Sequence, residues 1–364
     1  MTDLAARLDR LRGDAPARNH DARTIAALTT NPGCGRRGLM DAAGIDKDAV
    51  ARYLGFPAPF GQSQFAIARG NAFEKQVKDD GFAELFTLLR ERLGLPVPQV
   101  AIESLDEVGG NHGSELRHAQ TRRALARALA GDGSTLFDHP LLRLDIAGQP
   151  AYLEPDVLAF RLGDKFYVIE IKSFAIIDGQ ADPEQVAAAA RQSAVYVLAL
   201  RRLLTQLGHP ATAVSHEVIL VCPENFSNQP AAAFVDVRKQ LSVIERQLSR
   251  ISRIDDLVAA LPEEMTFELG DGLASAIRAV EARYAPDCVS SCELAFFCRD
   301  EARACGSTDL LGIAVRDDVG GVETLATALG LADGSLAPSP EQVEIAAKLR
   351  LARLLRAQAL EGVA

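Results

Sequence analysis

The clearest pattern of hydrophobic and polar positions lies in residues 152 to 173. The segment from Lys165 to Ser173 predicts a strand. Its part from Tyr167 to Lys172 is apolar and β-branched except at two polar positions spaced by two, which places both polar side chains on one face. Tyr152 to Arg161 predicts a partner strand. The Leu-Gly-Asp sequence at residues 162 to 164 favours a three-residue loop, because glycine and aspartate tolerate the backbone angles of tight turns. A β-hairpin is therefore expected here.

Segments with other periodicities surround this hairpin. Pro183 to Leu207 predicts a helix, since alanine and leucine occur throughout it without an internal breaker. Lys239 to Leu261 is typical of one long amphipathic helix. The fold class is therefore predicted to be α/β, a mixed sheet flanked by helices, with helical N- and C-terminal extensions. Further helices are expected in residues 1 to 30, 39 to 55, from 69 onward, 82 to 93, 115 to 130 and from 339 onward, and further strands in residues 215 to 222 and 232 to 237.

Composition places the chain among ordinary globular proteins. It has 364 residues, of which 48% are hydrophobic and 24% charged, enough for one large domain or two. No apolar run reaches the roughly 18 residues that a membrane span requires. Because no secretory signal opens the chain, a cytoplasmic location without membrane association is expected. The sequence contains no Walker-type phosphate loop, which argues against an ATPase or helicase.

The charge balance speaks against a nucleic-acid partner. Lysine and arginine number 39 and the acidic residues 49, a net charge of −10, whereas phosphate binding usually accompanies a basic excess. A locally positive surface would still be sufficient, although each basic stretch also fits a solvated helix face. The candidate stretches are Arg36-Arg37, Arg117 to Arg127 with His118, Arg122 and Arg123, and Arg201-Arg202.

The two polar positions of the predicted strand, Glu170 and Lys172, indicate metal chemistry. A three-residue loop sets Asp156 opposite Glu170, at a cross-strand distance of about 5 Å. Two carboxylates so close repel one another unless a cation lies between them, and Mg²⁺ prefers such oxygen ligands. Lys172 would then orient or deprotonate the attacking water, or offset charge on a phosphate. The alternative is chance, because a motif this short arises in many chains.

Two further motifs accompany the hairpin. Gln192 and Tyr196 are four residues apart in the predicted helix and share one face. Upstream, residues 69 to 74 (Arg-Gly-Asn-Ala-Phe-Glu) open another helical stretch and place Glu74 in its second turn. A solvated helix acid is the alternative for Glu74.

In this order, over residues 65 to 200, the motifs resemble the PD-(D/E)xK nuclease superfamily. The similarity is to its RecB-like branch, which includes CRISPR-associated RecB-type exonucleases and the AddB nuclease subunit. The resemblance implies a restriction-endonuclease-like sheet and a DNA nuclease dependent on Mg or Mn, with exonuclease-like action. Many RecB-like relatives have histidine where Glu74 stands, which leaves metal preference and metal number open. The implied metal ligands are Glu74, Asp156, Glu170 and the Ile171 carbonyl, and the other implied catalytic residues are Lys172, Gln192 and Tyr196.

Cysteines form a second signature. Cys288, Cys292 and Cys298 follow a C-x3-C-x5-C pattern, and Cys34 stands far upstream. Iron-sulfur RecB-like nucleases are similar, and the resemblance implies that these four cysteines hold a 4Fe-4S cluster joining the terminal extensions. Four thiolates also suit zinc, so zinc remains an alternative.

The remaining cysteines have other expected roles. Cys305 is a candidate substitute ligand of the cluster. Cys222 lies in an apolar run and is expected to be a buried strand residue. Disulfides are the alternative for the other cysteines, but a reducing cytoplasm disfavours them.

The sequence thus predicts a DNA nuclease of DNA repair, CRISPR adaptation or phage defence, a setting compatible with protein partners in a larger complex. One alternative is a catalytically weak DNA-binding or scaffolding subunit with the same fold. Another is a zinc-stapled protein without a nucleic-acid role. The expected regions are a helical N-terminal region (1–64), a nuclease core (65–262), a cysteine segment (263–305) and a helical C-terminal module (306–364).

Overall fold

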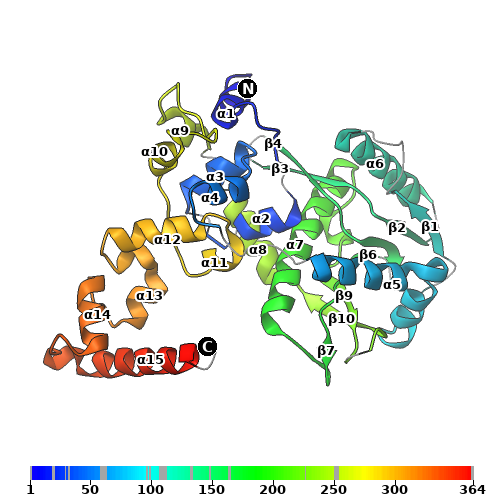
Figure 1. Ribbon diagram of the computed structural model, residues 1–364. Coiled ribbons are helices and arrows are strands. Elements are labelled where there is room, and N and C mark those ends of the chain that lie inside the picture. Colours follow the sequence, from blue (N-terminus) through cyan, green and yellow to red (C-terminus); the bar gives the residue numbers. More distant parts are fainter. Residues whose placement is uncertain are drawn as a thin grey trace. The chain divides into compact units, whose positions relative to one another are not determined.

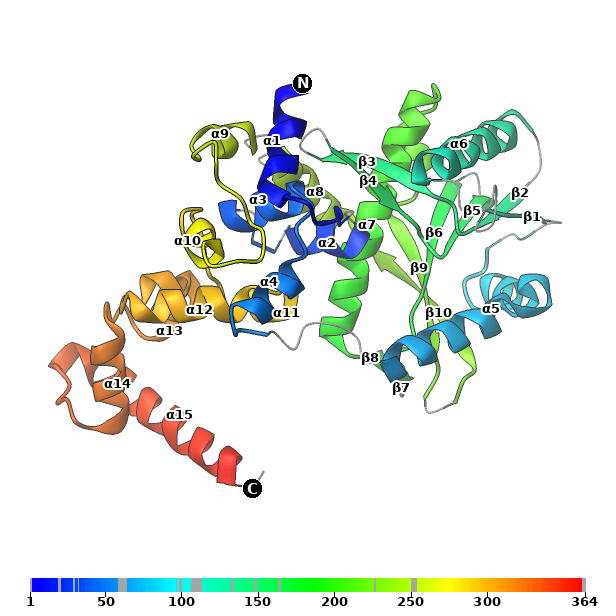
Figure 2. The ribbon, with the colours of Figure 1, turned by 45° about the horizontal axis from the view of Figure 1, so that its top comes forward.

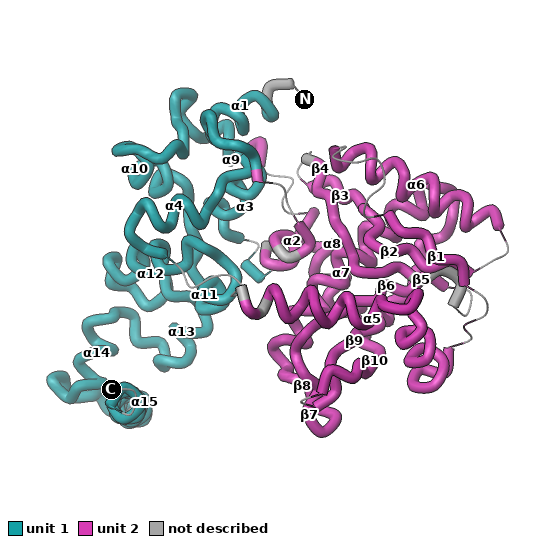
Figure 3. The backbone as a smooth tube through the Cα atoms, turned by 45° about the vertical axis from the view of Figure 1, so that its right-hand side comes forward, with its two compact units in different colours: residues 1–17, 30–60, 256–364 teal, residues 18–29, 61–255 magenta. Residues whose placement is uncertain are grey.

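The chain folds as two units, shown in different colours in Figure 3, and a computed structural model describes both. Unit 1 contains residues 1–17, 30–60 and 256–364, and unit 2 contains residues 18–29 and 61–255. The chain therefore passes between the units four times, after residues 17, 29, 60 and 255. The described residues are 2–18, 21–28, 30, 31, 33–57, 64–95, 97, 100–105, 113–131, 134–146, 149–162, 165–225, 227–249 and 254–361.

Unit 2 combines a mixed sheet with helices, so the predicted α/β class is confirmed for this part of the chain (Figure 1). Its helices are α2 (Ala22–Leu28), α5 (Gln64–Glu91), α6 (Ser114–Ala130), α7 (Pro183–Gln206), the 3₁₀ turn η1 (Ala211–Ala213) and α8 (Arg238–Leu248). Its strands are β1 (Val100–Ser104), β2 (Ser134–Asp138), β3 (Leu142–Ile146), β4 (Gln149–Leu153), β5 (Val157–Leu162), β6 (Lys165–Ile171), β7 (Ile176–Ile177), β8 (Gln180–Ala181), β9 (Glu217–Pro223) and β10 (Pro230–Asp236).

The main sheet has the strand order β1-β2-β5-β6-β9-β10. Two of its pairs, β1 with β2 and β6 with β9, are parallel, and the other pairs are antiparallel. The long helix α7 connects β6 to the parallel strand β9 and lies beside them in both views (Figures 1 and 2). Asp182 caps this helix by accepting from the backbone N–H of Glu184 and of Gln185, and Pro183 supplies a suitable first residue. The helix predicted over Pro183 to Leu207 is thus confirmed.

Alternation along the central strand distributes its side chains to two apolar cores. Phe166 and Val168 of β6 pack into a core with α7, α2 and α8, whereas Tyr167, Ile169 and Ile171 pack into a second core with α5. Polar residues that alternate with the second group therefore face α7. This assignment decides where the acidic residues of the hairpin point.

The hairpin differs from its predicted form in two respects. The expected strand Tyr152 to Arg161 is divided, because β4 pairs with β3 in a separate small sheet and only β5 joins the main sheet. Leu162 pairs with Lys165, so Leu162 belongs to the strand and not to a three-residue loop. Residues 163 and 164 lie outside the described part of the chain. Pro155 falls at the division, where its missing N–H cannot continue a ladder.

Unit 1 is built from helices that both ends of the chain contribute. The backbone N–H of Phe267 donates to the Leu11 carbonyl at 2.7 Å, and the Phe56 and Phe297 rings meet edge to face. The final helix follows a short 3₁₀ turn that begins with a capping box between Ser339 and Gln342. Its elements are α1 (Thr2–Arg12), α3 (Gly35–Ala42), α4 (Lys47–Tyr53), α9 (Ile254–Ala259, which begins at the unit boundary), α10 (Leu273–Arg278), α11 (Cys288–Ser291), α12 (Ala295–Ala304), η3 (Asp309–Leu311), α13 (Ile313–Asp318), α14 (Leu325–Asp333), η4 (Pro340–Gln342) and α15 (Val343–Glu361).

Two predicted helices have different bounds. The single helix expected over Lys239 to Leu261 is wrong, because α8 ends at Leu248 and the Ser249 hydroxyl donates to the Arg246 carbonyl. In α5 the backbone departs from helical angles between Asp79 and Phe82, which separates the expected helix over 82–93 from the one that carries Glu74. No helix in the described part of the chain is long and apolar enough to cross a membrane.

Candidate functional site

The pairing of β5 with β6 places Asp156 and Glu170 opposite each other. Val157 pairs with Ile169 in antiparallel register. Asp156, the residue just before β5, therefore stands opposite Glu170. The Asp156 carboxylate is fixed there, because Oδ2 accepts from the backbone N–H of Ile171 at 2.7 Å. Both acidic residues therefore lie at one end of the central strand pair, on the side that faces α7.

Glu170 is a fully buried carboxylate with incomplete pairing. Its exposed fraction is 0%, and Oε1 forms an ion pair with Lys172 Nζ. The other oxygen, Oε2, has no hydrogen-bond partner among the described residues. Burial, followed by the negative charge of Asp156, raises the pKa of Glu170 to about 8.

Lys172 and Asp156 respond to the same surroundings. Burial opposes the charge on Lys172, but the carboxylates of Glu170 and Asp156 outweigh it and raise the Lys172 pKa. Burial raises the pKa of Asp156, Lys172 opposes that rise, and Glu74 adds to it. The site thus concentrates negative charge that one lysine offsets only in part.

Tyr196 of α7 lies near this acidic pair, and Gln192 of the same helix contacts Tyr196. Gln192 Nε2 donates to the Tyr196 hydroxyl at 3.0 Å, which confirms that the two side chains share a helix face. Tyr196 is buried, and burial together with the charge of Glu170 raises its pKa well above the usual value. The hydroxyl therefore stays protonated near neutral pH, where it can both donate and accept.

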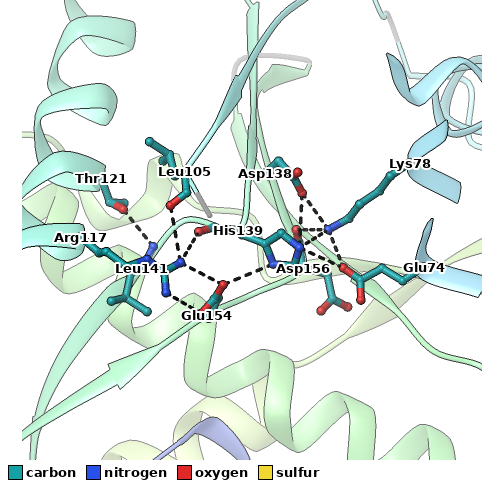
Figure 4. Close-up of polar contacts among 10 residues, drawn as sticks. All are labelled: Glu74, Lys78, Leu105, Arg117, Thr121, Asp138, His139, Leu141, Glu154 and Asp156. Carbon is teal, nitrogen blue, oxygen red and sulfur yellow. Dashed lines mark hydrogen bonds and ion pairs between the residues drawn. The ribbon is translucent and has the colours of Figure 1, made fainter. Parts of the chain in front are cut away.

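Glu74 lies in a neighbouring cluster of charged groups (Figure 4). Its Oε1 accepts from Lys78 Nζ at 2.5 Å and lies 3.3 Å from His139 Nε2. Burial would raise the pKa of Glu74, but these two partners lower it to about 2. Its charge in turn raises the pKa of both Asp156 and Glu170, so the two clusters are near enough to interact.

Four residues of this second cluster were not found from the sequence. Lys78 follows Glu74 by one helical turn, a spacing that could have indicated the pair. Asp138 ends β2 and His139 follows it, and no local pattern connects them to a helix some sixty residues earlier. Glu154 joins the cluster through Oε1, which lies 3.4 Å from His139 Nδ1.

No protein-family model matches the chain, and no curated protein matches it. The resemblance to RecB-like nucleases therefore remains a prediction from the motifs. Among the described histidine, cysteine, aspartate and glutamate residues, no three are grouped so that they could hold a metal ion as placed. The structure brings Asp156, Glu170 and Lys172 together and leaves Glu74 in its own cluster.

The four cysteines predicted to act together all belong to unit 1. Cys34 precedes α3, Cys288 and Cys292 bound the short helix α11, and Cys298 lies in α12. Burial raises the pKa of Cys298 to about 12, and the charges of Cys292 and Cys34 contribute to that rise. Cys298 therefore lies near enough to both Cys292 and Cys34 for their charges to act on it.

Hydrogen-bond donors surround these thiols. Asn31 Nδ2 donates to Cys288 Sγ at 3.3 Å, and Arg36 Nη1 donates to Cys298 Sγ at 3.2 Å. Burial raises the pKa of Cys292 to about 11, although the charges of Arg37 and Lys47 oppose that rise. Cys288 and Cys292 are thus buried, Cys34 and Cys298 are partly exposed, and cationic side chains lie near Cys292 and Cys298.

The same contacts correct one expectation about DNA binding. The sequence named Arg36-Arg37 as a candidate for a positive surface, but both side chains are buried, with exposed fractions of 3% and 4%. Arg37 Nε contacts Asp41 Oδ2 at 3.3 Å, and Arg36 pairs with Glu301. These arginines therefore belong to the interior around the cysteines.

The other two cysteines have separate places. Cys222 is fully buried in β9, so the prediction of a strand residue is confirmed. Cys305 is exposed at the end of α12, two helical turns after Cys298. None of the six cysteines forms a disulfide.

Proposed function

We propose that the chain is a metal-dependent DNA nuclease whose active site lies in unit 2, on a restriction-endonuclease-like sheet. The observation that carries this proposal is the facing pair Asp156 and Glu170, buried beside Lys172. A phosphodiesterase needs acidic ligands for a divalent cation next to a group that can act on water. The four motifs, in their order along the chain, support the same assignment.

The unpaired oxygen of Glu170 supports its assignment as a metal ligand. A buried carboxylate without a donor carries a large desolvation penalty, which a bound cation removes. The raised pKa of Glu170 has the same cause, since burial and the charge of Asp156 disfavour its ionised form, and a bound Mg²⁺ or Mn²⁺ would favour that form. Asp156, Glu170 and the Ile171 carbonyl would hold the ion, with Glu74 as a further ligand.

The residues of the chain then divide the work. A bound divalent cation would stabilise negative charge on the phosphate and make the attacking water more acidic. Lys172 orients that water through its ammonium group and balances charge near the phosphate. Gln192 and Tyr196, fixed to each other on α7, position the substrate strand or the lysine side chain.

We also propose that Cys34, Cys288, Cys292 and Cys298 hold a 4Fe-4S cluster. A cluster with four thiolates is anionic, and the buried Arg36, Arg37 and Lys47 would offset its charge. Arg37 Nη1 has no hydrogen-bond partner among the described residues, and a cluster sulfide would accept from it. Zinc is the alternative metal, because four thiolates suit it equally well.

The nuclease proposal is tested by incubating linear single- and double-stranded DNA with the purified protein and Mg²⁺ or Mn²⁺. Wild type should cut DNA, and chelation of the metal should stop the reaction. Lys172→Ala and Asp156→Ala should each lower the rate by about 100-fold or more, as expected for loss of a group that acts on water or holds the metal.

A matched control is Lys165→Ala, because Lys165 is an exposed lysine on the same strand. This variant should cut at the wild-type rate. Equal cutting by wild type, Lys172→Ala and Asp156→Ala would reject the assignment of the site.

The net charge of −10 favours a second candidate function, a scaffolding or DNA-binding subunit with a weak site. Such a protein would bind DNA, or protein partners in a repair or defence complex, without measurable cutting at any divalent-metal concentration. A zinc-stapled protein with no nucleic-acid role would neither cut nor bind DNA. Anaerobic purification separates the metals, because an iron-sulfur protein is brown and a zinc protein is colourless.

A further inference from the structure

The ammonium group of Lys78 occupies a cage of acceptors (Figure 4). Around Nζ lie Glu74 Oε1 at 2.5 Å, Asp138 Oδ1 at 2.7 Å, His139 Nε2 at 3.0 Å and the Asp156 carbonyl oxygen at 3.2 Å. The Lys78 side chain is largely buried, with an exposed fraction of 12%. Four groups thus converge on one positive charge.

These four groups are typical metal ligands. Two carboxylates, a backbone carbonyl and an imidazole nitrogen are donors that Mn²⁺ and Mg²⁺ sites use. An ammonium has only three N–H bonds for four neighbours. Asp138 Oδ1 lies 2.7 Å from Nζ, and Asp138 and Glu74 together raise the pKa of Lys78 against the opposing effect of burial. The cage therefore places more acceptors around Lys78 than its three N–H bonds can serve.

The backbone builds this cage from three separate segments. Glu74 and Lys78 come from successive turns of α5, and Asp138 ends β2. His139 adopts a left-handed backbone with φ of 49°, which is uncommon outside glycine, and its N–H donates to the Asp156 carbonyl at 3.3 Å. Asp156 thus contributes its carbonyl to the cage and its side chain to the acidic pair with Glu170.

We propose that Lys78 is a built-in substitute for a second metal ion. The site then binds a single divalent cation, between Asp156 and Glu170, and the ammonium of Lys78 supplies the second positive charge. This inference rests on the proposed nuclease function in one respect, the divalent cation between Asp156 and Glu170. It also assigns Lys78 as a positioning residue, because the lysine holds Glu74 through Oε1 beside the acidic pair.

The experiment counts bound Mn²⁺ per chain by electron paramagnetic resonance of free Mn²⁺ during titration of the metal-free protein. Wild type should bind one Mn²⁺. Lys78→Met keeps the length of the side chain and removes its charge, so the vacated cage should take up a second Mn²⁺. The control Lys75→Met changes an exposed lysine on the same helix and should bind one.

A double variant tests the ligands. Adding Asp138→Asn to Lys78→Met should return the number from two to one, because the cage then loses a carboxylate. Two Mn²⁺ on wild type would overturn the substitution, and this result needs no variant to fold. One Mn²⁺ on a folded Lys78→Met protein would overturn it as well.

The outcomes separate this inference from the nuclease proposal. If the wild type cuts DNA and binds two Mn²⁺, the nuclease proposal is supported and the role proposed for Lys78 is overturned. Wild type that binds one Mn²⁺, with two on Lys78→Met, supports the role of Lys78 even if no DNA is cut. Wild type that binds none overturns both.

Discussion

At the scale of single residues, the burial of the Glu170 carboxylate has a direct energetic consequence. An acid with no exposed surface and one unpaired oxygen is costly in the metal-free protein, and its pKa near 8 reflects that cost. The neighbouring lysine compensates one oxygen only. Such a residue is retained at the expense of stability, which is common for groups that serve chemistry.

The buried acid predicts a pH dependence of metal-free stability. The Glu170 pKa is about 4.5 in the unfolded chain and about 8 in the folded one. Its contribution to the free energy of unfolding is therefore fully present below about pH 4.5 and is lost as the pH rises through about 8. Glu170→Gln should remove this loss, by on the order of a few kcal/mol at about 1.4 kcal/mol per pKa unit.

The measurement is urea unfolding with chelator present at pH 5.5 and pH 8.5. Glu170→Gln should be more stable than wild type at pH 8.5, with a smaller difference at pH 5.5. Glu245→Gln, which changes an exposed acid on α8, serves as the control. If the free energy of unfolding changed with pH in the same way for wild type and Glu170→Gln, ionisation of the buried Glu170 would not be destabilising.

At the scale of elements, α7 links the sheet to the site. The helix buries one face against the central strands and brings Tyr196 near Glu170, with Gln192 bonded to Tyr196. The hydrogen bond between the two side chains fixes both, and a net contribution of about 1 kcal/mol to stability is expected for such a bond. Its larger effect should be on positioning.

The pair should therefore act as a unit in catalysis. Gln192→Ala and Tyr196→Phe should each lower the cutting rate, by about 10-fold, while the protein remains folded. The double variant should lose little more than either single one, because both changes remove the same contact. Additive losses in this double-mutant cycle would mean that the two side chains act separately.

The sequence predicted those elements whose patterns are local. Alternation in β6 and its register with β5 placed Asp156 against Glu170, and helical spacing placed Gln192 beside Tyr196. Patterns failed where pairing is non-local, since the division of the segment at residues 152 to 161 depends on a strand pairing with β3.

The cage around Lys78 was beyond sequence reasoning for the same reason. It joins a helix to a strand end with a left-handed residue, and spacing along the chain carries no record of that approach. The buried Arg36 and Arg37 show the converse failure, because a basic pair was expected at the surface. Only the surrounding thiols and acids explain its burial.

At the scale of the whole molecule, the cysteines close a very long loop. Cys34 and Cys288 lie 254 positions apart in the sequence, and unit 2 lies almost entirely between them. A metal centre that bridges them would stabilise unit 1 through the entropy of closure as well as through bonding.

Cys292→Ser should therefore lower the melting temperature by several degrees and abolish visible absorption in the anaerobically purified protein. Cys305→Ser is the matched control, because Cys305 is exposed at the end of α12. It should keep the colour and the melting temperature of wild type. A fully stable Cys292→Ser protein, or a colourless Cys305→Ser protein, would contradict the assigned ligands.

The division of the chain between the units also sets an order of events during translation. Unit 2 is complete once residue 255 has left the ribosome, whereas unit 1 still lacks the segment that begins at residue 256. Cys34 is synthesised early and has no sulfur neighbours until Cys288, Cys292 and Cys298 emerge. If the proposed 4Fe-4S cluster forms, cells starved of iron should accumulate chains in which unit 2 is folded and unit 1 lacks the cluster.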